Sequence, residues 1–370
     1  MNMSLFTSTL FTSLSICVLI VFTQPLHGRL TLDHLPGVQM LHGKPVPRIG
    51  GVGLFLGLLA AWGLAPDSLG SLLAPLLVAG LPALGAGLLE DITKLIGVRV
   101  RLLATMVSGV LICLLTGASL DHLDIPLIDP LFALSPVAVL FTAFALAGIA
   151  NAINIIDGVN GLASGVLVCC SAAIGLVAAG VGDTELAWTA ALLAAASAGF
   201  WLVNFPFGKL FLGDGGAYFG GFALAWLAVL LPMRNPDVSP WVGLLVCAYP
   251  VIETLYTILR RLRSHQSPGA PDAAHLHSLV MSCLVARRAP GWPAWAQHSL
   301  VSLPLWGLAA APAALAIWLA LEPAQNLALA FAGMFVAYHL IYRLVLCRQK
   351  ARPASPLRQD PRQEHLHAPR

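Results

Sequence analysis

Residues 69–89 read LGSLLAPLLVAGLPALGAGLL and contain no charged side chain. A helix of about 20 mostly apolar residues is long enough to cross the roughly 30 Å hydrocarbon core of a bilayer. The rest of the chain has the same character, because 58% of its 370 residues are hydrophobic, 10% are charged, and the mean hydropathy is +0.83. Soluble domains carry roughly 25% charged residues. The composition therefore excludes a soluble globular protein and predicts an all-α, polytopic integral membrane protein.

Eleven segments meet this test, some marginally, so we expect about 11 transmembrane helices in one domain, residues 1–347. Residues 348–370, rich in Pro, Arg and Gln, are predicted to form a disordered cytoplasmic tail. Lys and Arg remain on the cytoplasmic side of membrane proteins. With the N-terminus in the periplasm and the C-terminus in the cytoplasm, 19 of the 20 Lys and Arg residues are cytoplasmic and Arg234 alone is not. The other predicted spans are residues 5–22, 51–64, 102–117, 131–149, 162–180, 186–203, 217–231, 242–259, 300–319 and 327–341.

The polar residues that could do chemistry gather on the predicted cytoplasmic loops. In the first loop, Lys44 and Arg48 flank two prolines and precede a pair of glycines, so a stiff turn could bring cations to an anionic ligand. An ordinary cationic membrane anchor is the alternative. In the second loop, Glu90 and Asp91 end a helix, where acids oppose the macrodipole. That placement indicates a use such as metal binding, with a solvated helix end as the alternative.

The third loop is unusually rich in asparagine. Asn151, Asn154 and Asp157 step by three residues, so a helical turn places them on one face. Asn160 follows, just before Gly161 opens the next span. Asparagine in so apolar a chain is costly unless its polar atoms are satisfied. The loop therefore predicts a polar site, with a network that joins helices as the alternative.

The fourth loop runs from Asn204 through Phe211 to the glycine-rich sequence GDGG, residues 213–216. It precedes a span, so the glycines form a helix N-terminus, whose N–H groups favour phosphate. Asp214 among these glycines is an accessible carboxylate for a hard cation such as Mg²⁺. A plain glycine-rich turn is the alternative. A Walker A loop is excluded, because G-x-x-x-x-G-K-[ST] is absent.

The fifth loop is the longest. It begins with an arginine-rich stretch, residues 260–263, and contains His275 and His277. Zinc would need further nitrogen or sulfur ligands nearby, and none is evident, so the two histidines are predicted to contact phosphate or a nucleotide. A polar surface loop is the alternative. Glu253, near the cytoplasmic end of its span, is an intramembrane acid and therefore a functional candidate.

Together the five loops resemble the polyprenyl-phosphate N-acetylhexosamine-1-phosphate transferases, a family that includes the enzymes that initiate O-antigen synthesis and phospho-N-acetylmuramoyl-pentapeptide translocase. Asn154 and Asp157 match the motif N-x-x-D-G-x-D-G-L, in which Asn160 replaces the second Asp. The spacing of His275 and His277, with one residue between them, resembles the O-antigen branch of the family more than the peptidoglycan branch. Further matching positions are Lys44, Arg48, Asp91, Arg101, Asn204, Phe211 and Asp214, whereas Glu90 and Ser278 depart from the family pattern.

The resemblance implies transfer of an N-acetylaminosugar-1-phosphate from a UDP-sugar, such as UDP-N-acetylglucosamine, to undecaprenyl phosphate, with UMP as the second product. Two like-charged phosphates must meet, so Mg²⁺ (or Mn²⁺) and basic side chains are needed to offset their repulsion. Asp91, Asp157 and Asp214 would be the catalytic residues, with Asp214 and Asp91 at the metal. The implied substrate-binding residues are Lys44, Arg48, Arg101, Asn154, Asn160, Asn204, Phe211, Gly213, His275 and His277.

The implied partners are the UDP-aminosugar, undecaprenyl phosphate and the lipid bilayer of the bacterial inner membrane. A homodimer is one implied oligomeric state, and no nucleic-acid partner is expected. The active site would face the cytoplasm, and the product would begin O-antigen or another envelope polysaccharide. A secondary transporter of an anionic substrate is the alternative, but transporters place their polar sites near the bilayer midplane, whereas these motifs lie at helix ends. The sequence leaves the identity of the aminosugar open.

Overall fold

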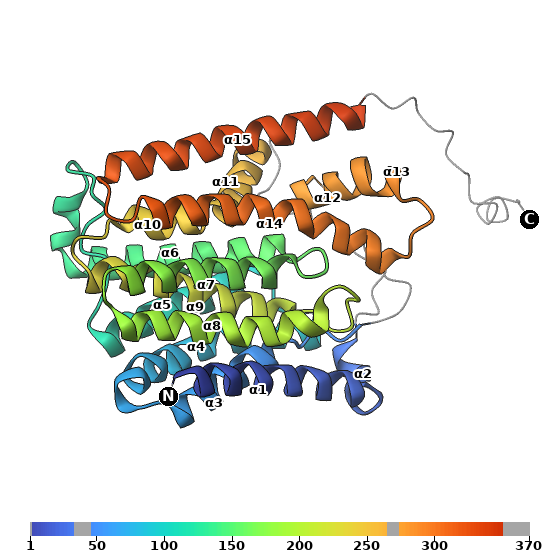
Figure 1. Ribbon diagram of the computed structural model, residues 1–370, viewed down its shortest axis with the longest axis horizontal. Coiled ribbons are helices and arrows are strands. Elements are labelled where there is room, and N and C mark those ends of the chain that lie inside the picture. Colours follow the sequence, from blue (N-terminus) through green and yellow to red (C-terminus); the bar gives the residue numbers. More distant parts are fainter. Residues whose placement is uncertain (1, 33–45, 265–273, 351–370) are drawn as a thin grey trace, which may run out of the picture.

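The computed structural model describes residues 2–32, 46–264 and 274–350. Within these ranges most helices run side by side along one axis (Figure 1), and apart from one isolated bridge between Leu32 and Pro47 there is no strand. The elements are α1 (Asn2–Phe22), α2 (Gln24–Thr31), α3 (Gly51–Leu64), α4 (Asp67–Thr93), α5 (Val98–Thr116), the 3₁₀ turn η1 (Asp129–Ala133), α6 (Ser135–Ile156), α7 (Leu162–Gly180), α8 (Thr184–Asn204), α9 (Gly213–Arg234), α10 (Pro240–Val246), α11 (Ala248–Arg263), α12 (Leu276–Val280), the π-helical turn η2 (Met281–Val285), α13 (Ala286–Arg288), α14 (Ala294–Trp318) and α15 (Ala324–Lys350).

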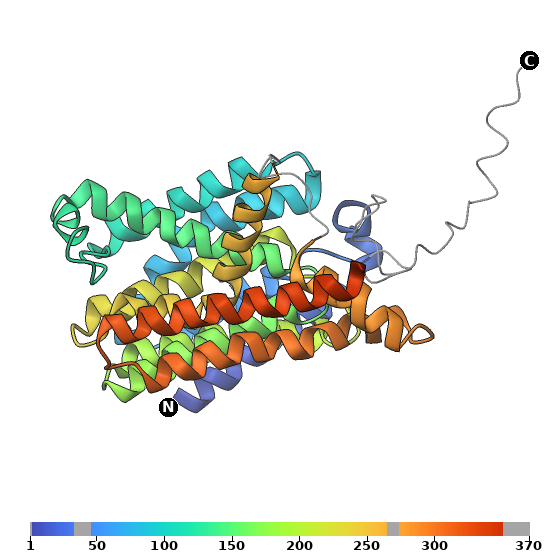
Figure 2. The ribbon, with the colours of Figure 1, turned by 90° about the horizontal axis from the view of Figure 1, so that it is seen from above.

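The predicted all-α, polytopic architecture is confirmed. Nine of the described helices are long and apolar enough to cross a membrane, and α10 with α11 makes a tenth if this bent pair is one span. Each of the eleven predicted segments contains a helix, although α3 has only 14 residues. The predicted span over residues 242–259 is not one continuous helix, because the chain breaks at Cys247 and bends by 78°. As a result α11 crosses the other helices instead of running along them (Figure 2).

Two further boundaries differ from expectation. The short helix α2 follows directly on α1 and was not foreseen. Helix α15 continues to Lys350, past the predicted domain boundary at residue 347. The rest of the predicted tail lies outside the described residues.

Helix α9 lies at the centre of the bundle. Every residue from Gly213 to Pro232 is buried, and α9 packs against α3, α4, α6 and α7. Its first half reads GDGGAYFGGFALA, and small residues of this kind let helices approach closely in lipid, where no hydrophobic force drives them together. The start of α9, which carries Asp214, is therefore enclosed by the ends of other helices.

Connecting segments alternate between the two ends of the bundle, because consecutive long helices run in opposite directions (Figure 1). Most of the described cations lie on segments at the end that holds α2, α12 and α13 (Figure 1), whereas Arg234 is the last residue of α9, the helix that begins with Asp214. There Arg234 donates to Asp183 at 2.7 and 3.0 Å and to Glu185 at 3.0 Å. Its charge is thus compensated by two acids. Which end faces the cytoplasm stays a prediction.

Glycines bring three helices into backbone contact at the cation-rich end. A Cβ on Gly51, the first residue of α3, would collide with Gly216 on α9. A Cβ on Gly87 in α4 would collide with the backbone of Asp214 and Gly215. Because only glycine permits such approach, α3, α4 and α9 are fixed against one another at the point where the predicted site residues lie.

Candidate active site

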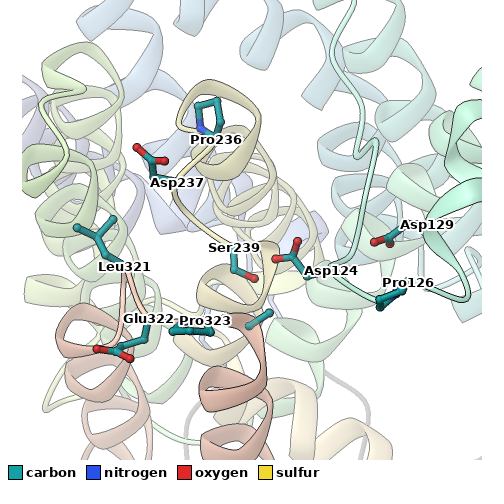
Figure 3. A pocket seen from close by; sticks show the side chains of 10 residues that line it. Asp124, Pro126, Asp129, Pro236, Asp237, Ser239, Leu321, Glu322 and Pro323 are labelled. Atoms are coloured by element: carbon teal, nitrogen blue, oxygen red, sulfur yellow. The ribbon is translucent and has the colours of Figure 1, made fainter.

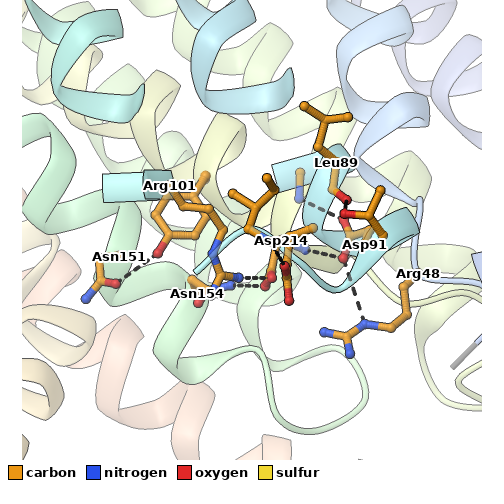
Figure 4. Close-up of polar contacts among 12 residues, drawn as sticks. Arg48, Leu89, Asp91, Arg101, Asn151, Asn154 and Asp214 are labelled. Carbon is orange, nitrogen blue, oxygen red and sulfur yellow. Dashed lines mark hydrogen bonds and ion pairs between the residues drawn. The ribbon is translucent and has the colours of Figure 1, made fainter. Parts of the chain in front are cut away.

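Asp91 binds the N-terminus of helix α9. Its Oδ1 accepts the backbone N–H of Asp214 at 2.9 Å, and its Oδ2 accepts that of Gly215 at 2.9 Å (Figure 4). The first N–H groups of a helix lack partners within the helix and favour an anion, which stabilises this carboxylate although Asp91 is only 1% exposed. The expectation that these N–H groups bind phosphate is therefore wrong for these two, because Asp91 already occupies them.

The side chain of Asp214 is held by two donors from other helices. Arg101, on α5, donates from Nη1 to Oδ2, and Asn154, on α6, donates to Oδ1 at 2.7 Å. The guanidinium of Arg101 also lies 5.6 Å from the ring centroid of Tyr218, a favourable cation–π distance, and the Tyr218 hydroxyl donates to Asn151 at 3.1 Å. Helices α4, α5, α6 and α9 thus bring four of the predicted site residues together.

The turn into α9 requires glycine at position 213. Gly213 has a φ of +74°, a conformation that side chains rarely adopt, and a Cβ there would collide with the carbonyl of Arg48 and lie 2.5 Å from Oδ2 of Asp91. The segment that carries Arg48 pairs with this turn, since Phe211 N–H donates to the carbonyl of Pro47 at 2.9 Å. The Nε of Arg48 lies 3.9 Å from Oδ1 of Asp91. The predicted first and fourth loops therefore meet at Asp91.

Asp157 directly follows α6 and interacts with the same charges. It repels the carboxylate of Asp91 and is attracted by Arg48. Although the residue keeps some solvent exposure, desolvation raises the pKa of its carboxyl to about 7, and the charge of Arg48 opposes this rise only in part. Asp157 is therefore a group that can exchange a proton near neutral pH.

The predicted histidine loop reaches the same end of the bundle. The ring of His277 packs so closely against Gly158 that a Cβ on this glycine would collide with it. The ring of His275 stacks on that of His277 with centroids 5.5 Å apart, and Nδ1 of His275 lies 3.1 Å from Oε1 of Glu253. The fifth loop thus lies against the third, one residue from Asp157.

Two predicted substrate-binding asparagines join loops to one another. Asn160, 1% exposed, donates to the carbonyl of Pro206 at 2.8 Å. The side chain of Asn204 accepts the N–H of the residue before α7 and donates to the carbonyl of Leu210 at 2.7 Å. The contact of Asn160 corresponds to the alternative for the third loop, a network that joins helices, and a substrate-binding role for Asn160 or Asn204 stays a prediction. Lys44 lies outside the described residues.

Sequence reasoning missed two tyrosines and the reason for Glu90. Tyr218 lies one helical turn after Asp214, a spacing that could have indicated its contact with the same site. Tyr338 donates to Glu253 at 2.6 Å from 85 residues away, and no sequence signal indicates that contact. Glu90 accepts the N–H of Ile96 at 2.7 Å, so it stabilises the turn that follows α4.

The carboxylates at the start of α9 suit a hard cation that is bound together with substrate. Enzymes usually hold Mg²⁺ with one or two carboxylates plus substrate phosphates and water. In the described part of the chain, no group of three or more His, Cys, Asp or Glu residues is arranged to hold a metal alone. Asp214 and Asp91 supply two carboxylates, and each oxygen keeps a second lone pair beside its hydrogen bond. These residues therefore fit Mg²⁺ whose coordination is completed by phosphate.

A pocket of about 470 Å³ lies at the end of the bundle away from α12 and α13 (Figure 1), and Figure 3 shows it from close by. It is formed by the connections that precede α6, α10 and α15, and its acids are Asp124, Asp129, Asp237 and Glu322. Asp129 accepts the N–H of Leu123 at 2.7 Å. No cation and no predicted site residue is among the residues that line it, so the candidate site is the one at the start of α9.

Comparison with known proteins identifies the family. The family model described as glycosyl transferase family 4 matches residues 73–232, the range from α4 to α9 that contains Asp91, Asp157 and Asp214. The undecaprenyl-phosphate alpha-N-acetylglucosaminyl 1-phosphate transferase of Salmonella typhi is 30% identical over 258 residues, which cover 68% of this chain and 70% of that protein. The chain belongs to glycosyl transferase family 4.

Further relatives agree with this assignment. The probable undecaprenyl-phosphate N-acetylglucosaminyl 1-phosphate transferase of Bacillus subtilis (strain 168) is 29% identical over 255 residues, 68% of this chain and 70% of the relative. The undecaprenyl-phosphate alpha-N-acetylglucosaminyl 1-phosphate transferase of Escherichia coli (strain K12) is 28% identical over 277 residues, 74% of each chain. The protein is therefore an enzyme of the sugar-1-phosphate transferase class and a multi-pass membrane protein, as predicted.

Proposed function

We propose that the protein transfers N-acetylglucosamine-1-phosphate from UDP-N-acetylglucosamine to undecaprenyl phosphate, with release of UMP. The family and the names of the relatives support this reaction. An oxygen of the lipid phosphate bonds to the sugar-bearing phosphorus, and the bond from that phosphorus to UMP breaks. The lipid product then begins O-antigen or a related envelope polysaccharide.

The observation that carries the chemistry is the junction of Asp214 with Asp91, Arg101 and Asn154 at the N-terminus of α9. Two phosphates of like charge must approach, and preorganised positive charge is the principal way in which enzymes stabilise such an encounter. Asp214 and Asp91 would hold Mg²⁺, with Mn²⁺ as an alternative. When bound, this ion neutralises phosphate charge and polarises phosphoryl oxygens.

The remaining residues divide between the two substrates. We assign Lys44, Arg48 and Arg101 to the phosphate of the lipid, and His275 and His277 to the diphosphate of the nucleotide. A phosphate monoester has a second pKa near 6, so most of the lipid acceptor is already dianionic at neutral pH. Where a proton remains, Asp157 suits its removal better than Asp91, whose oxygens both accept backbone N–H groups.

We further assign the cation-rich end of the bundle to the cytoplasmic face of the bacterial inner membrane. Lys and Arg mark the cytoplasmic side of membrane proteins, and most of the described cations lie on segments at the end where α9 begins with Asp214. The lipid substrate would then reach the site from the bilayer, and the nucleotide from the cytoplasm.

The test uses the purified full-length protein with undecaprenyl phosphate, Mg²⁺ and a panel of radiolabelled UDP-aminosugars. We expect labelled lipid and an equal amount of UMP with UDP-N-acetylglucosamine, and loss of both in EDTA with recovery on added Mg²⁺. Asp214→Asn should lose turnover, whereas Asp237→Asn, at the opposite end of the bundle, should retain it. No product from any donor, or full activity in Asp214→Asn, would refute the proposal.

A secondary transporter of an anionic substrate is the alternative from the sequence, and the same preparation distinguishes it. In sealed vesicles a transporter moves labelled substrate across the membrane without forming UMP. The polar residues at the helix ends, rather than at the middle of broken helices, favour the transferase.

A further inference from the structure

Glu253 is a buried acid to which the proposed reaction gives no role. It lies on α11 and is 1% exposed, yet three polar groups converge on it. The hydroxyl of Tyr338, on α15, donates to Oε2 at 2.6 Å, and the N–H of Leu276 donates to Oε1 at 3.2 Å. Nδ1 of His275 lies 3.1 Å from the same Oε1. Buried carboxylates are stable when several donors satisfy their oxygens in this way.

The contact with Glu253 orients the His275 ring. The Nδ1 edge of the ring is held at the carboxylate, 3.1 Å from Oε1, and the Thr257 hydroxyl lies 3.4 Å from the same nitrogen. The other nitrogen, Nε2, lies on the opposite edge of the ring and is directed away from the carboxylate. A carboxylate behind a histidine orients metal-binding imidazoles by the same geometry.

Helix α15 supports the histidine segment on both sides of this contact. The hydroxyl of Tyr342 donates to the carbonyl of Ala274 at 2.9 Å, and Tyr338 holds Glu253 from one turn earlier. His277, which follows Leu276, then packs against Gly158 on the third loop. The bend at Cys247 carries α11 across the bundle, and with it the carboxylate that binds the segment.

We propose that Glu253, braced by Tyr338, is a positioning residue that holds His275 and His277 against the third loop and thereby sets the affinity for the diphosphate of the sugar nucleotide. The inference rests on the proposed function, because it assigns these histidines to the nucleotide donor. Glu253 acts through the histidine segment, with no contact of its own to the reacting phosphates.

The test measures KM for both substrates in full-length protein reconstituted in lipid nanodiscs, together with calorimetric binding of UDP-N-acetylglucosamine. We expect Glu253→Gln to raise KM and Kd for the nucleotide roughly 10- to 100-fold, the usual cost of removing an orienting carboxylate, and to leave KM for undecaprenyl phosphate unchanged. Tyr338→Phe should shift the same two constants by a smaller factor, roughly fivefold, because it removes one hydrogen bond.

A matched control is available in Tyr249→Phe. Tyr249 is a buried tyrosine that lies one helical turn before Glu253 on α11. Its hydroxyl has no hydrogen-bond partner in the described part of the chain, so its removal should leave both KM values within about twofold of wild type. If Glu253→Gln does not fold, the comparison of Tyr338→Phe with Tyr249→Phe still tests the proposed role of Glu253.

A double-mutant cycle separates positioning from general destabilisation. If Glu253 acts through His275, the pair Glu253→Gln with His275→Ala should bind the nucleotide no more weakly than His275→Ala alone. Multiplicative effects, equal changes in both KM values, or Tyr338→Phe behaving like Tyr249→Phe would overturn the proposal. An inactive wild type refutes the proposed function itself, whereas an active wild type with unaltered variants refutes only the role of Glu253.

Discussion

The carboxylate of Asp91 accepts the backbone N–H of Asp214 across a separation of 123 residues. The side chain of Asp214 in turn accepts from Arg101 and Asn154. The two acids therefore have different surroundings although they lie side by side. Asp91 is compensated by the positive end of the α9 dipole, whereas Asp214 is compensated by a guanidinium. Asp91 therefore orders the start of α9 in addition to its proposed role at the metal, whereas the side chain of Asp214 takes no part in that cap.

Replacement of Asp91 by Asn should destabilise the fold as well as reduce activity. One oxygen becomes an NH₂ donor that faces a backbone N–H, and an unsatisfied buried donor costs about 1–3 kcal/mol. The control is Glu90→Gln, whose amide oxygen can still accept from Ile96. Thermal unfolding in detergent should show a lower Tm for Asp91→Asn than for Glu90→Gln. Equal Tm values would mean that the cap on α9 contributes nothing.

Alanine at Gly213 should disrupt the site through the backbone. The φ of +74° is strained for alanine, at a cost on the order of 1–3 kcal/mol, and the new methyl group would displace Arg48 or Asp91. Gly85→Ala in α4 is the control, because nothing lies within 4 Å of its Cβ position. That change should be neutral or stabilising by about 0.5–1 kcal/mol. Turnover and Tm should both fall for Gly213→Ala only.

Lysine at Arg101 should lower kcat without unfolding the protein. A lysine keeps the charge but loses the planar group that binds Asp214 while it lies over Tyr218. We expect a fall of at least about tenfold, equivalent to about 1.4 kcal/mol of transition-state stabilisation. Arg99→Lys, exposed in the same first turn of α5, should turn over at the wild-type rate. A kcat of wild-type size in Arg101→Lys would show that the guanidinium of Arg101 has no role in the reaction.

The pH dependence of stability should reveal Asp157. Its pKa is about 7 in the fold against about 3.9 in an unfolded chain, so the folded state binds more protons between these values. Stability from this group therefore falls as the pH rises from about 4 to about 7. Asp157→Asn cannot titrate and should gain Tm relative to wild type across that window, in EDTA. A constant difference between pH 4 and 8 would contradict the raised pKa.

Asp183→Asn should lower the stability of the protein at neutral pH, whereas Asp157→Asn should raise it. Partial burial alone would raise the pKa of Asp183, but hydrogen bonds from Arg234 and from the N–H of Leu186 outweigh it and hold the pKa below its usual value. The stability that this carboxylate contributes is present above about pH 4 and is lost as the pH falls through the lowered pKa. Wild type should therefore exceed Asp183→Asn in Tm at neutral pH and approach it in acid.

The sequence predicts the elements of this fold better than their contacts. Hydropathy locates the segment around Leu69 and its ten counterparts, and the step of three residues from Asn151 to Asn154 correctly places both side chains toward α9. The bend at Cys247 is not predictable, since an apolar run has the same hydropathy whether it is straight or broken. Nor does local sequence show that Asp91 would occupy the start of α9, because that contact depends on packing between helices far apart in the chain.

The partners of Asn160 and Asn204 could not be predicted from the sequence either. Asn160 and Asn204 stand out in an apolar chain because their amides need partners, and this need is met equally by substrate or by backbone. The structure supplies Pro206 and Leu210 as partners. Residue type therefore indicated that a polar network exists, whereas the identity of its members required the packing of α7, α8 and α14.

The contacts of Gly51 with Gly216 and of Gly87 with the backbone of Gly215 contain no side chain. A rotamer change can adjust the gap between two side chains, but nothing at these contacts can rotate. The distance between Asp91 on α4 and Asp214 on α9 is therefore set by contacts between peptide backbones, whose dimensions do not vary. Any motion that opens the substrate sites must move whole helices past one another or occur in the loops that surround this fixed centre.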